Sequence, residues 1–276
     1  MIFYRKTATA ASFLNFRALT IGIRSKAKLQ SNPNAQNSAM PNSQDLSHYT
    51  PRPHPKGISL VGQDVILRPL SVADHCEDLF AANSQDTEGA NWRYLPYGPF
   101  ATLQAYQAWL SVQEPLQDPV FFAIIRRSDN RAIGLASYLR IDPANGSIEV
   151  GHINFAPPLQ RSRAGTEAMV LMMQWAFEQG YRRYEWKCDA LNQKSRYAAQ
   201  RLGLSYEGVF RQMSIVKGRN RDTAWFAAID SEWPALKAAF QRYLDPANFD
   251  AQGQPILALS ALTHPLLFKR DDLAFS

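Results

Sequence analysis

The apolar positions along this chain alternate or recur with helical spacing, and they divide most of it into strands and helices. Short β-rich runs predict strands over 65–67, 120–125, 132–141, 148–155, 184–188, 206–216 and 223–229. Helical spacing predicts helices over 72–82, 102–113, 166–179, 192–202 and 231–243. Gly180 and Gly203 supply left-handed stops to two of these helices.

Three of the predicted strands follow one another through tight turns. Asp129-Asn130 and the run from Asp142 to Gly146 supply these turns, so residues 120–155 should form an antiparallel meander. The strand–helix–strand unit over 148–188 should be a right-handed parallel crossover. We therefore expect an α+β fold with a single mixed, mostly antiparallel sheet and helices on both faces.

The residues before the first predicted strand have a different composition. Six Lys and Arg and no Asp or Glu lie before residue 45, and residues 29–57 are rich in Asn, Ser, Gln and Pro. An acid-poor amphipathic start that carries Arg is typical of a mitochondrial transit peptide, whereas a disordered tail or an extended start is the alternative. We expect a leader and linker over 1–57, a folded domain over 58–245 and a C-terminal tail over 246–276. The expected location is intracellular, in the cytoplasm or the mitochondrion.

The net charge of +6 comes from this leader. Without its six cations, 24 Lys and Arg face 24 Asp and Glu, so the basic balance gives no reason to expect a nucleic-acid partner. No run of eighteen apolar residues predicts a membrane span. Cys76 and Cys188 form neither a disulfide nor a zinc pattern, and we expect no metal site. The sequence carries no signal for an oligomeric state.

The junction between the predicted strand 148–155 and the following helix carries candidate chemistry. It reads Phe155-Ala-Pro-Pro-Leu-Gln-Arg-Ser-Arg-Ala-Gly-Thr166. The first N–H groups of a helix have no internal partner, and the helix dipole favours an anion there. Arg161 and Arg163 would add charge-assisted donors. This junction predicts a phosphate-binding loop, with an ordinary surface loop as the alternative.

The same junction resembles the coenzyme-binding segment of GNAT acetyltransferases. The stretch Ile148-Glu-Val-Gly-His-Ile-Asn-Phe-Ala-Pro157, followed by Gln160 and by Gly165-Thr-Glu-Ala168, is similar to the family pattern Gln/Arg-x-x-Gly-x-Gly/Ala. Several further motifs resemble the RimJ/RimL-like branch: Thr166-Glu167-Ala168, Asn192-Gln-Lys-Ser195, Arg201-Leu-Gly-Leu204 and Leu67-Arg-Pro-Leu70. The resemblance covers about residues 59–230.

This resemblance implies a GNAT-like acyl-CoA N-acyltransferase fold, acetyl-CoA as the cofactor and transfer of an acetyl group to a primary amine. The amine would be a peptide N-terminus, a small metabolite or an antibiotic-like polyamine. It implies cofactor contacts from Phe155, Ala156, Gln160, Arg161, Ser162, Arg163, Ala164, Gly165, Thr166 and Asn192. Arg161 and Arg163 stand where the family has glycines, so a catalytically silent CoA-binding module is the alternative function.

Direct acyl transfer from a thioester needs a neutral amine, a donor for the developing oxyanion and a proton or positive field for the thiolate. Glu149 is the candidate base, with a structural ion pair as its alternative role. Along a regular strand it should share a face with Gly151, Ile153 and Phe155. His152 is the second candidate base.

The resemblance also implies a tyrosine acid seven residues after Asn192, but Ala199 stands there and Tyr197 points to a different helix face. Members of the branch have a serine three residues after the asparagine, which is Ser195 here. Ser195 would donate to the thiolate or hold a water, or it would cap the first turn. Direct attack requires no cysteine nucleophile, so we expect Cys188 to be a packed core residue.

An aromatic loop with two prolines, residues 91–100, lies between the first two predicted helices. The resemblance places such a loop on the acceptor side. Trp92, Tyr94 and Tyr97 are therefore candidate substrate-binding residues, and hydrophobic packing over the core is the alternative.

Overall fold

The computed structural model describes residues 45–272, and the chain from Tyr49 onward forms one compact unit. The predicted leader falls on residues 1–44, outside the described residues. Residues 49–57, expected to be linker, contact the domain. The Arg52 N–H donates to the Pro143 carbonyl over 3.1 Å, and the Tyr181 hydroxyl donates to the Pro53 carbonyl over 3.0 Å. The compact unit therefore begins before residue 58.

One eight-stranded sheet forms the centre of this unit, in the order β1-β2-β3-β4-β5-β6-β8-β7. Neighbouring strands are antiparallel except β5 and β6, which are parallel. The predicted meander and mixed sheet are thus confirmed. Only the two-residue β1 was not predicted. The strands are β1 (Leu60–Val61), β2 (Val65–Pro69), β3 (Val120–Arg126), β4 (Arg131–Asp142), β5 (Ser147–Phe155), β6 (Arg183–Asp189), β7 (Ser205–Val216) and β8 (Arg219–Ile229).

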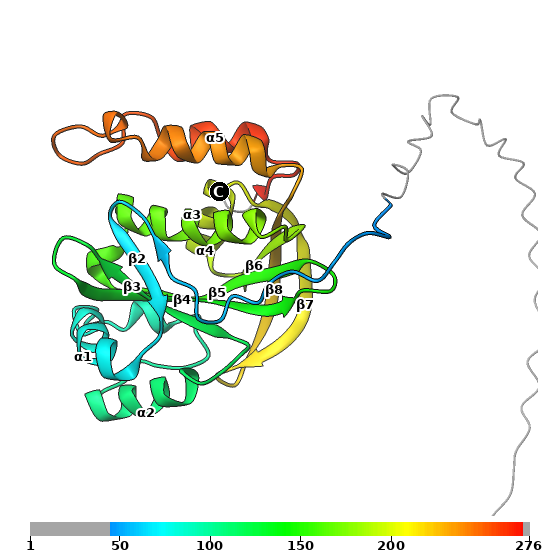
Figure 1. The fold of residues 1–276 in the computed structure, drawn as a ribbon. Coiled ribbons are helices and arrows are strands. Elements are labelled where there is room, and N and C mark those ends of the chain that lie inside the picture. Colours follow the sequence, from blue (N-terminus) through cyan, green and yellow to red (C-terminus); the bar gives the residue numbers. More distant parts are fainter. Residues whose placement is uncertain (1–44, 273–276) are drawn as a thin grey trace, which may run out of the picture. The chain divides into compact units, whose positions relative to one another are not determined.

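Helices cover both faces of the sheet, as predicted: Figure 1 shows α1 and α2 on one face and α3, α4 and α5 on the other. The helices are α1 (Val72–Asn83), α2 (Leu103–Gln113), α3 (Arg163–Glu178), α4 (Gln193–Arg201), α5 (Trp233–Leu244) and α6 (Leu259–Thr263). In the described part of the chain, no helix is both long and apolar enough to cross a bilayer. α3 begins three residues earlier than predicted because Ser162 caps it, its hydroxyl accepting from the Gly165 N–H over 2.9 Å.

Two hydrophobic clusters lie on the two faces of the sheet. The larger one packs α3 against the strands through Met169, Met172, Met173 and Ala176, the face that the helical spacing predicted. The smaller one packs α1, α2 and the aromatic loop, with Leu79, Trp92, Tyr106, Leu110 and Phe121 buried. α1 packs on β4, whereas the main helix contacts of β6, β7 and β8 come from α3 and α4 on the other side. The opposite face of these three strands, called the outer face below, carries charged side chains of β6 such as Glu185 and Lys187, together with the Trp225 ring.

The chain after α5 packs back onto the domain. Asp271 is 1% exposed, and its carboxylate accepts from Arg196 Nε and Nη2 over 2.6 and 2.5 Å. Arg196 Nη1 also donates to the Ala190 carbonyl over 2.8 Å. The described part of the expected 246–276 tail therefore belongs to the fold, and it supports the loop between β6 and α4.

Replacement of Asp271 tests this anchor. Asp271→Ala leaves the buried Arg196 guanidinium without its counter-charge, so the free energy of unfolding should fall by about 3–5 kcal/mol in urea titrations. Asp272→Ala, at the exposed neighbouring position, should change it by less than about 0.5 kcal/mol. Equal effects of the two variants would show that the buried pair is not an anchor.

Candidate active site

The parallel pairing of β5 with β6 ends partway along both strands. It covers four residue pairs, from Ser147–Arg183 to Val150–Trp186. β5 nevertheless continues to Phe155 and β6 to Asp189. Beyond the Val150–Trp186 pair, the facing main-chain groups of the two strands no longer satisfy each other. They are available to an extended ligand that carries amides of its own.

A β-bulge in β5 lies next to this break. Ser137 of β4 pairs with Gly151 of β5, and the next pair is Leu135 with Asn154. The chain thus advances three residues in β5 for two in β4. Within this bulge, His152 has a positive φ of 50°. The bulge shifts the alternation of faces by one residue.

The prediction that Glu149, Ile153 and Phe155 lie on the same face of β5 is therefore wrong. Ile153 and Phe155 pack on the α3 side, together with Val150. His152 lies on the opposite side, where its ring stacks on Tyr97 with centroids 5.7 Å apart. Glu149 alternates with Val150, so it shares the face of His152.

The predicted phosphate-binding loop joins the end of β5 to α3. Because Ser162 caps the Gly165 N–H, the earlier N–H groups of Arg163 and Ala164 remain without intrahelical partners. Arg161 is exposed and has a φ of 53°, in the left-handed region that favours glycine. A glycine would adopt this conformation without strain. Arginine bears a cost of about 1 kcal/mol there.

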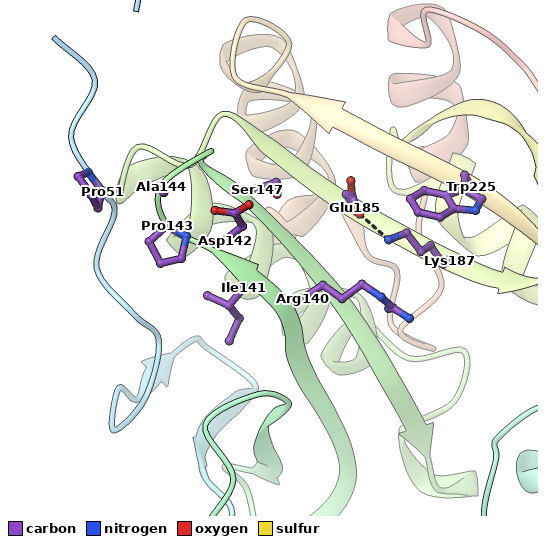
Figure 2. A pocket seen from close by; sticks show the side chains of 10 residues that line it. All are labelled: Pro51, Arg140, Ile141, Asp142, Pro143, Ala144, Ser147, Glu185, Lys187 and Trp225. Atoms are coloured by element: carbon purple, nitrogen blue, oxygen red, sulfur yellow. Dashed lines mark ion pairs between the residues drawn. The ribbon is translucent and has the colours of Figure 1, made fainter. Parts of the chain in front are cut away.

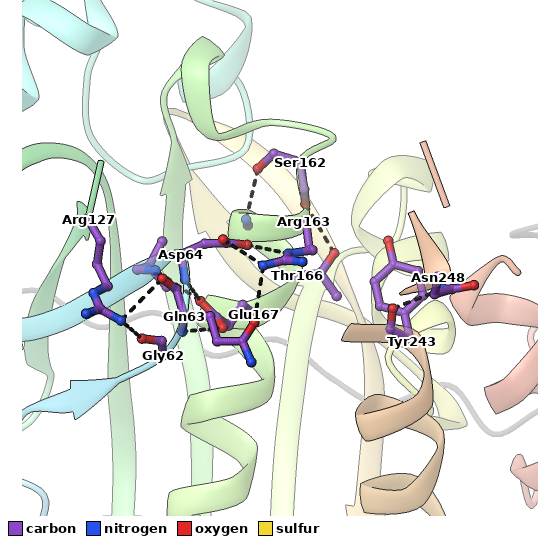
Figure 3. A network of polar contacts seen from close by, with 12 residues as sticks. Gly62, Gln63, Asp64, Arg127, Ser162, Arg163, Thr166, Glu167, Tyr243 and Asn248 are labelled. Atoms are coloured by element: carbon purple, nitrogen blue, oxygen red, sulfur yellow. Dashed lines mark hydrogen bonds and ion pairs between the residues drawn. The ribbon is translucent and has the colours of Figure 1, made fainter. Parts of the chain in front are cut away.

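The two arginines of this loop have different surroundings, and Figure 3 shows those of Arg163. The Arg163 guanidinium donates to both carboxylate oxygens of Asp64, Nε over 2.6 Å and Nη2 over 2.9 Å, which raises its pKa. Glu167 fixes the same turn, its carboxylate accepting from the N–H groups of Gln63, Asp64 and Val65 over 2.7–3.0 Å. The Arg163 side chain thus joins α3 to the β1–β2 turn. Arg161 forms no ion pair within the described chain.

The aromatic loop is braced from three sides. Gln160, a predicted cofactor residue, donates to Asn91 Oδ1 over 2.7 Å and to the Phe155 carbonyl over 2.8 Å. The Tyr94 hydroxyl donates to the carbonyl of Leu191, and Lys217 donates to the carbonyls of Trp92 and Gly98, over 2.9–3.2 Å. Trp92 is buried and packs in the smaller cluster. Tyr97 reaches β5, where its hydroxyl lies 3.1 Å from His152 Nδ1.

Glu149 stands on the outer face of the sheet, 3% exposed and between two cations. Its Oε2 accepts from Arg140 Nη1 over 2.7 Å and from Lys187 Nζ over 2.8 Å. No described residue forms a hydrogen bond with the other oxygen, Oε1. Oε1 lies beside Gly151, 3.7 Å from the position that a Cβ on that residue would occupy. Burial raises the pKa of Glu149, although Lys187 and Arg140 oppose that shift. The ion pair expected as the alternative role is present, and one carboxylate oxygen remains open.

A pocket of about 630 Å³ adjoins this ion pair (Figure 2). Lys187 lies at its edge, paired with Glu185 over 2.7 Å and 3.6 Å above the Trp225 ring. The lining residues are Pro51, Arg140, Ile141, Asp142, Pro143, Ala144, Ser147, Glu185, Lys187 and Trp225.

Ser195 lies at the level of Glu149 but on the other face of the sheet. Its Oγ accepts from Trp186 Nε1 over 2.9 Å, and Trp186 belongs to the last paired rung. The cap of α4 is Asn192, which accepts the Ser195 N–H over 3.2 Å, so the Ser195 hydroxyl does not cap the helix and lies within hydrogen-bonding reach of the Cys188 thiol. Cys188 is buried in the larger cluster, which raises the pKa of its thiol to about 11 and agrees with a packing role.

Sequence reasoning missed Arg140 and Lys187, the two cations that hold Glu149. A signal for Lys187 was present, because charged residues alternate with apolar ones in Arg183-Tyr-Glu-Trp-Lys-Cys-Asp189 and so mark a charged face of β6. No comparable pattern marks Arg140. It has a φ of 46°, and its N–H and that of Ile141 donate to Asp118.

Comparison with known proteins identifies related folds. A model of the acetyltransferase (GNAT) domain matches residues 64–205. A GCN5-related N-acetyltransferase from Brucella melitensis is 46% identical, with a TM-score of 0.77, over 78% of this chain and 98% of that one. A probable GNAT-family acetyltransferase from Chromobacterium violaceum is 38% identical, with a TM-score of 0.67, over 71% and 98%. RimL, a ribosomal L7/L12 alpha-N-protein acetyltransferase, shares the fold at 20% identity, with a TM-score of 0.54, over 63% and 99%. No curated protein sequence matches the chain.

The partly buried His152 gives the site a measurable pH dependence. Burial lowers its pKa from 6.5 to about 4, with Arg140 and Arg221 adding to the shift. The folded state favours the neutral ring, so this stabilisation is present above about pH 6.5 and is lost as the pH falls through about 4. Between neutral pH and pH 4, the free energy of unfolding should fall by roughly 2–3 kcal/mol more in the parent than in His152→Asn. If the free energy of unfolding depends on pH in the same way in both proteins, the lowered pKa of His152 is contradicted.

Proposed function

This chain belongs to the GNAT family of acetyltransferases, which use acetyl-CoA, and we propose that it transfers the acetyl group to a primary amine by direct attack, without an acyl-enzyme. The observation that carries the proposal is the break in the β5–β6 ladder. The start of α3 follows the end of β5, and Glu149 and Ser195 stand on the two faces of the sheet at the last paired rung. A buried, protonated Cys188 supports direct attack.

Binding of acetyl-CoA would use groups that the fold leaves open. The N–H groups of Arg163 and Ala164 and the Arg161 guanidinium would hold the phosphates. The unpaired main chain of β5 beyond Val150 would bond to the amides of the pantetheine arm. The thioester would then lie near the rung formed by Val150 and Trp186.

In the reaction, the C–N bond of the new amide forms as the thioester C–S bond breaks. Oε1 of Glu149 would take the proton that the amine loses, directly or through a water, while Arg140 and Lys187 keep the carboxylate ionised before transfer. On the other face, the Ser195 hydroxyl would donate to the departing thiolate, held in place by the Trp186 N–H. The two roles fall on opposite faces because the reacting centre lies between the strands.

We also infer that the chain belongs to the RimJ/RimL-like branch. Two residues of the motifs that resemble this branch have defined structural roles. Glu167 fixes the β1–β2 turn to α3, and Asn192 caps α4 and places Ser195 beside Trp186. The acceptor is then a peptide N-terminus or a small-molecule amine. Release of free thiol from acetyl-CoA on addition of a broad amine panel tests the activity directly.

Glu149→Gln should lower turnover about a hundred- to ten-thousand-fold, because it keeps the shape of the side chain and loses the base. The affinity for CoA should barely change. The deficit should shrink as the pH rises, since more of the acceptor amine is then neutral. Glu207→Gln, which changes an exposed carboxylate at the far end of the same chain of ion pairs, is the control and should keep the parent rate. A Glu149→Gln variant as fast as the parent would sink the assignment.

Arg161→Glu should weaken binding of CoA about tenfold or more, because it replaces a phosphate donor with a like charge. Binding of pantetheine, which lacks the pyrophosphate, should not change. Arg211→Glu, at an exposed position of β7, controls for overall charge. Calorimetry with both ligands measures the effect. Equal losses of affinity for CoA and pantetheine would mean that the substitution had distorted the loop and that Arg161 does not bind phosphate.

A further inference from the structure

The outer face of β8 carries a row of polar atoms that are shielded from solvent and have no hydrogen-bond partner among the described residues. Arg221 Nε, Thr223 Oγ1 and Trp225 Nε1 occupy every second position, so they share one face of the strand. Ser214 Oγ, on the β7 residue paired with Arg221, is in the same state. Thr223 is 4% exposed.

β5 adds a further unsatisfied group to this face. Both side-chain atoms of Asn154 lack partners in the described chain, and the residue is 1% exposed. Beyond the bulge, Asn154 faces the same side as His152. β5 and β8 are the two neighbours of β6 in the sheet, and Arg221 contributes to the low pKa of His152. β5 and β8 therefore present unsatisfied polar atoms to the same region, on either side of β6.

Such atoms are costly unless something binds them. Each buried donor or acceptor left unsatisfied costs about 1–3 kcal/mol, and native proteins keep few of them. A ligand that bonds to several of these groups at once would remove that cost. The chemistry of the face then indicates the chemistry of the ligand.

The ion pairs of this region balance, because the carboxylates of Glu149 and Glu185 face the cations of Lys187 and Arg140. Arg221 adds a cation to these four residues. The Arg140 side chain is 58% exposed at the edge of the pocket, and Arg221 forms no ion pair with any described residue. Three of the six unsatisfied atoms are N–H donors, on Arg221, Trp225 and Asn154, and two more are hydroxyls that can donate. A ligand that satisfies them must bring acceptor atoms, and the unpaired Arg221 favours one that also carries negative charge.

We propose that the acceptor is an amine that also carries a carboxylate, and that Arg221, the Trp225 indole N–H and Arg140 bind this carboxylate on the outer face of the sheet. The inference rests on the proposed acetyl transfer. It favours amino acids, and peptides with an acidic side chain near the N-terminus. It disfavours polyamines, whose extra cations meet Arg140 and Arg221. The carboxylate is unchanged by the reaction.

Matched acceptors test the proposal on the full-length protein. Free amino acids and short ω-amino carboxylates are each compared with their primary amides, and peptides with Asp at the second position are compared with their Asn counterparts. We expect kcat/KM for the carboxylate member to exceed that of its amide by at least about tenfold, as expected for a charge-assisted pair. The two sets of probes distinguish a free amino acid from a peptide acceptor.

Variants of the same strand assign the effect to the residues. Arg221→Gln should raise KM for carboxylates and leave the amides unchanged. Trp225→Phe, which keeps an aromatic ring at this position and removes the indole N–H, should have the same effect. Arg219→Gln, exposed on the same strand, is the matched control. Equal losses on carboxylates and amides would overturn the proposal.

A second measurement separates this proposal from the acetyl transfer on which it rests. Calorimetry compares binding of each N-acetylated carboxylate product, and of its amide, to the protein–CoA complex. Carboxylate preference in binding without thiol release would refute the transfer and keep the site. Amides or polyamines that bind and react as well as carboxylates would refute the site and keep the transfer.

Discussion

The pairing of Val150 with Trp186 is the last rung between β5 and β6, and the rest of the candidate site depends on the strands parting there. A continuous ladder would satisfy the main-chain groups of both strands and leave none for a ligand. The bulge at Gly151 and His152 helps to end the ladder and turns the following side chains over. Its positive φ at His152 costs on the order of 1–3 kcal/mol. The two hydrophobic clusters on either side of the sheet can offset that cost.

Electrostatics then divide the site into two sides. On the outer face, the carboxylate of Glu149 is held by two cations through one oxygen, which leaves the other oxygen open near Gly151. On the α4 face, Ser195 and the indole N–H of Trp186 lie beside the larger hydrophobic cluster. Acid and base chemistry therefore meet the reacting centre from opposite directions.

The sequence predicted the main strands and helices to within a few residues because each is long enough to show its period. It also located the loop between β5 and α3, the candidate phosphate-binding loop, because the features of that loop are local. It could not predict the bulge, because the alternation of apolar and polar residues does not reveal an inserted residue. Ile153 and Phe155 were therefore assigned to the wrong face of β5. Nor could it predict that Asp64, 99 residues away, would pair with the Arg163 side chain. The pair of Arg196 and Asp271, 75 residues apart, was hidden for the same reason.

Hydrogen exchange with and without saturating acetyl-CoA tests the central claim most directly, because the account assigns the ligand to specific main-chain groups. The amides of residues 151–155 in β5 and of Arg163 and Ala164 should exchange more slowly when acetyl-CoA is bound. Those of α5, which lies away from the break in the ladder, should not change. Binding of acetyl-CoA, seen as a rise in melting temperature, without slower exchange at either segment would contradict the account.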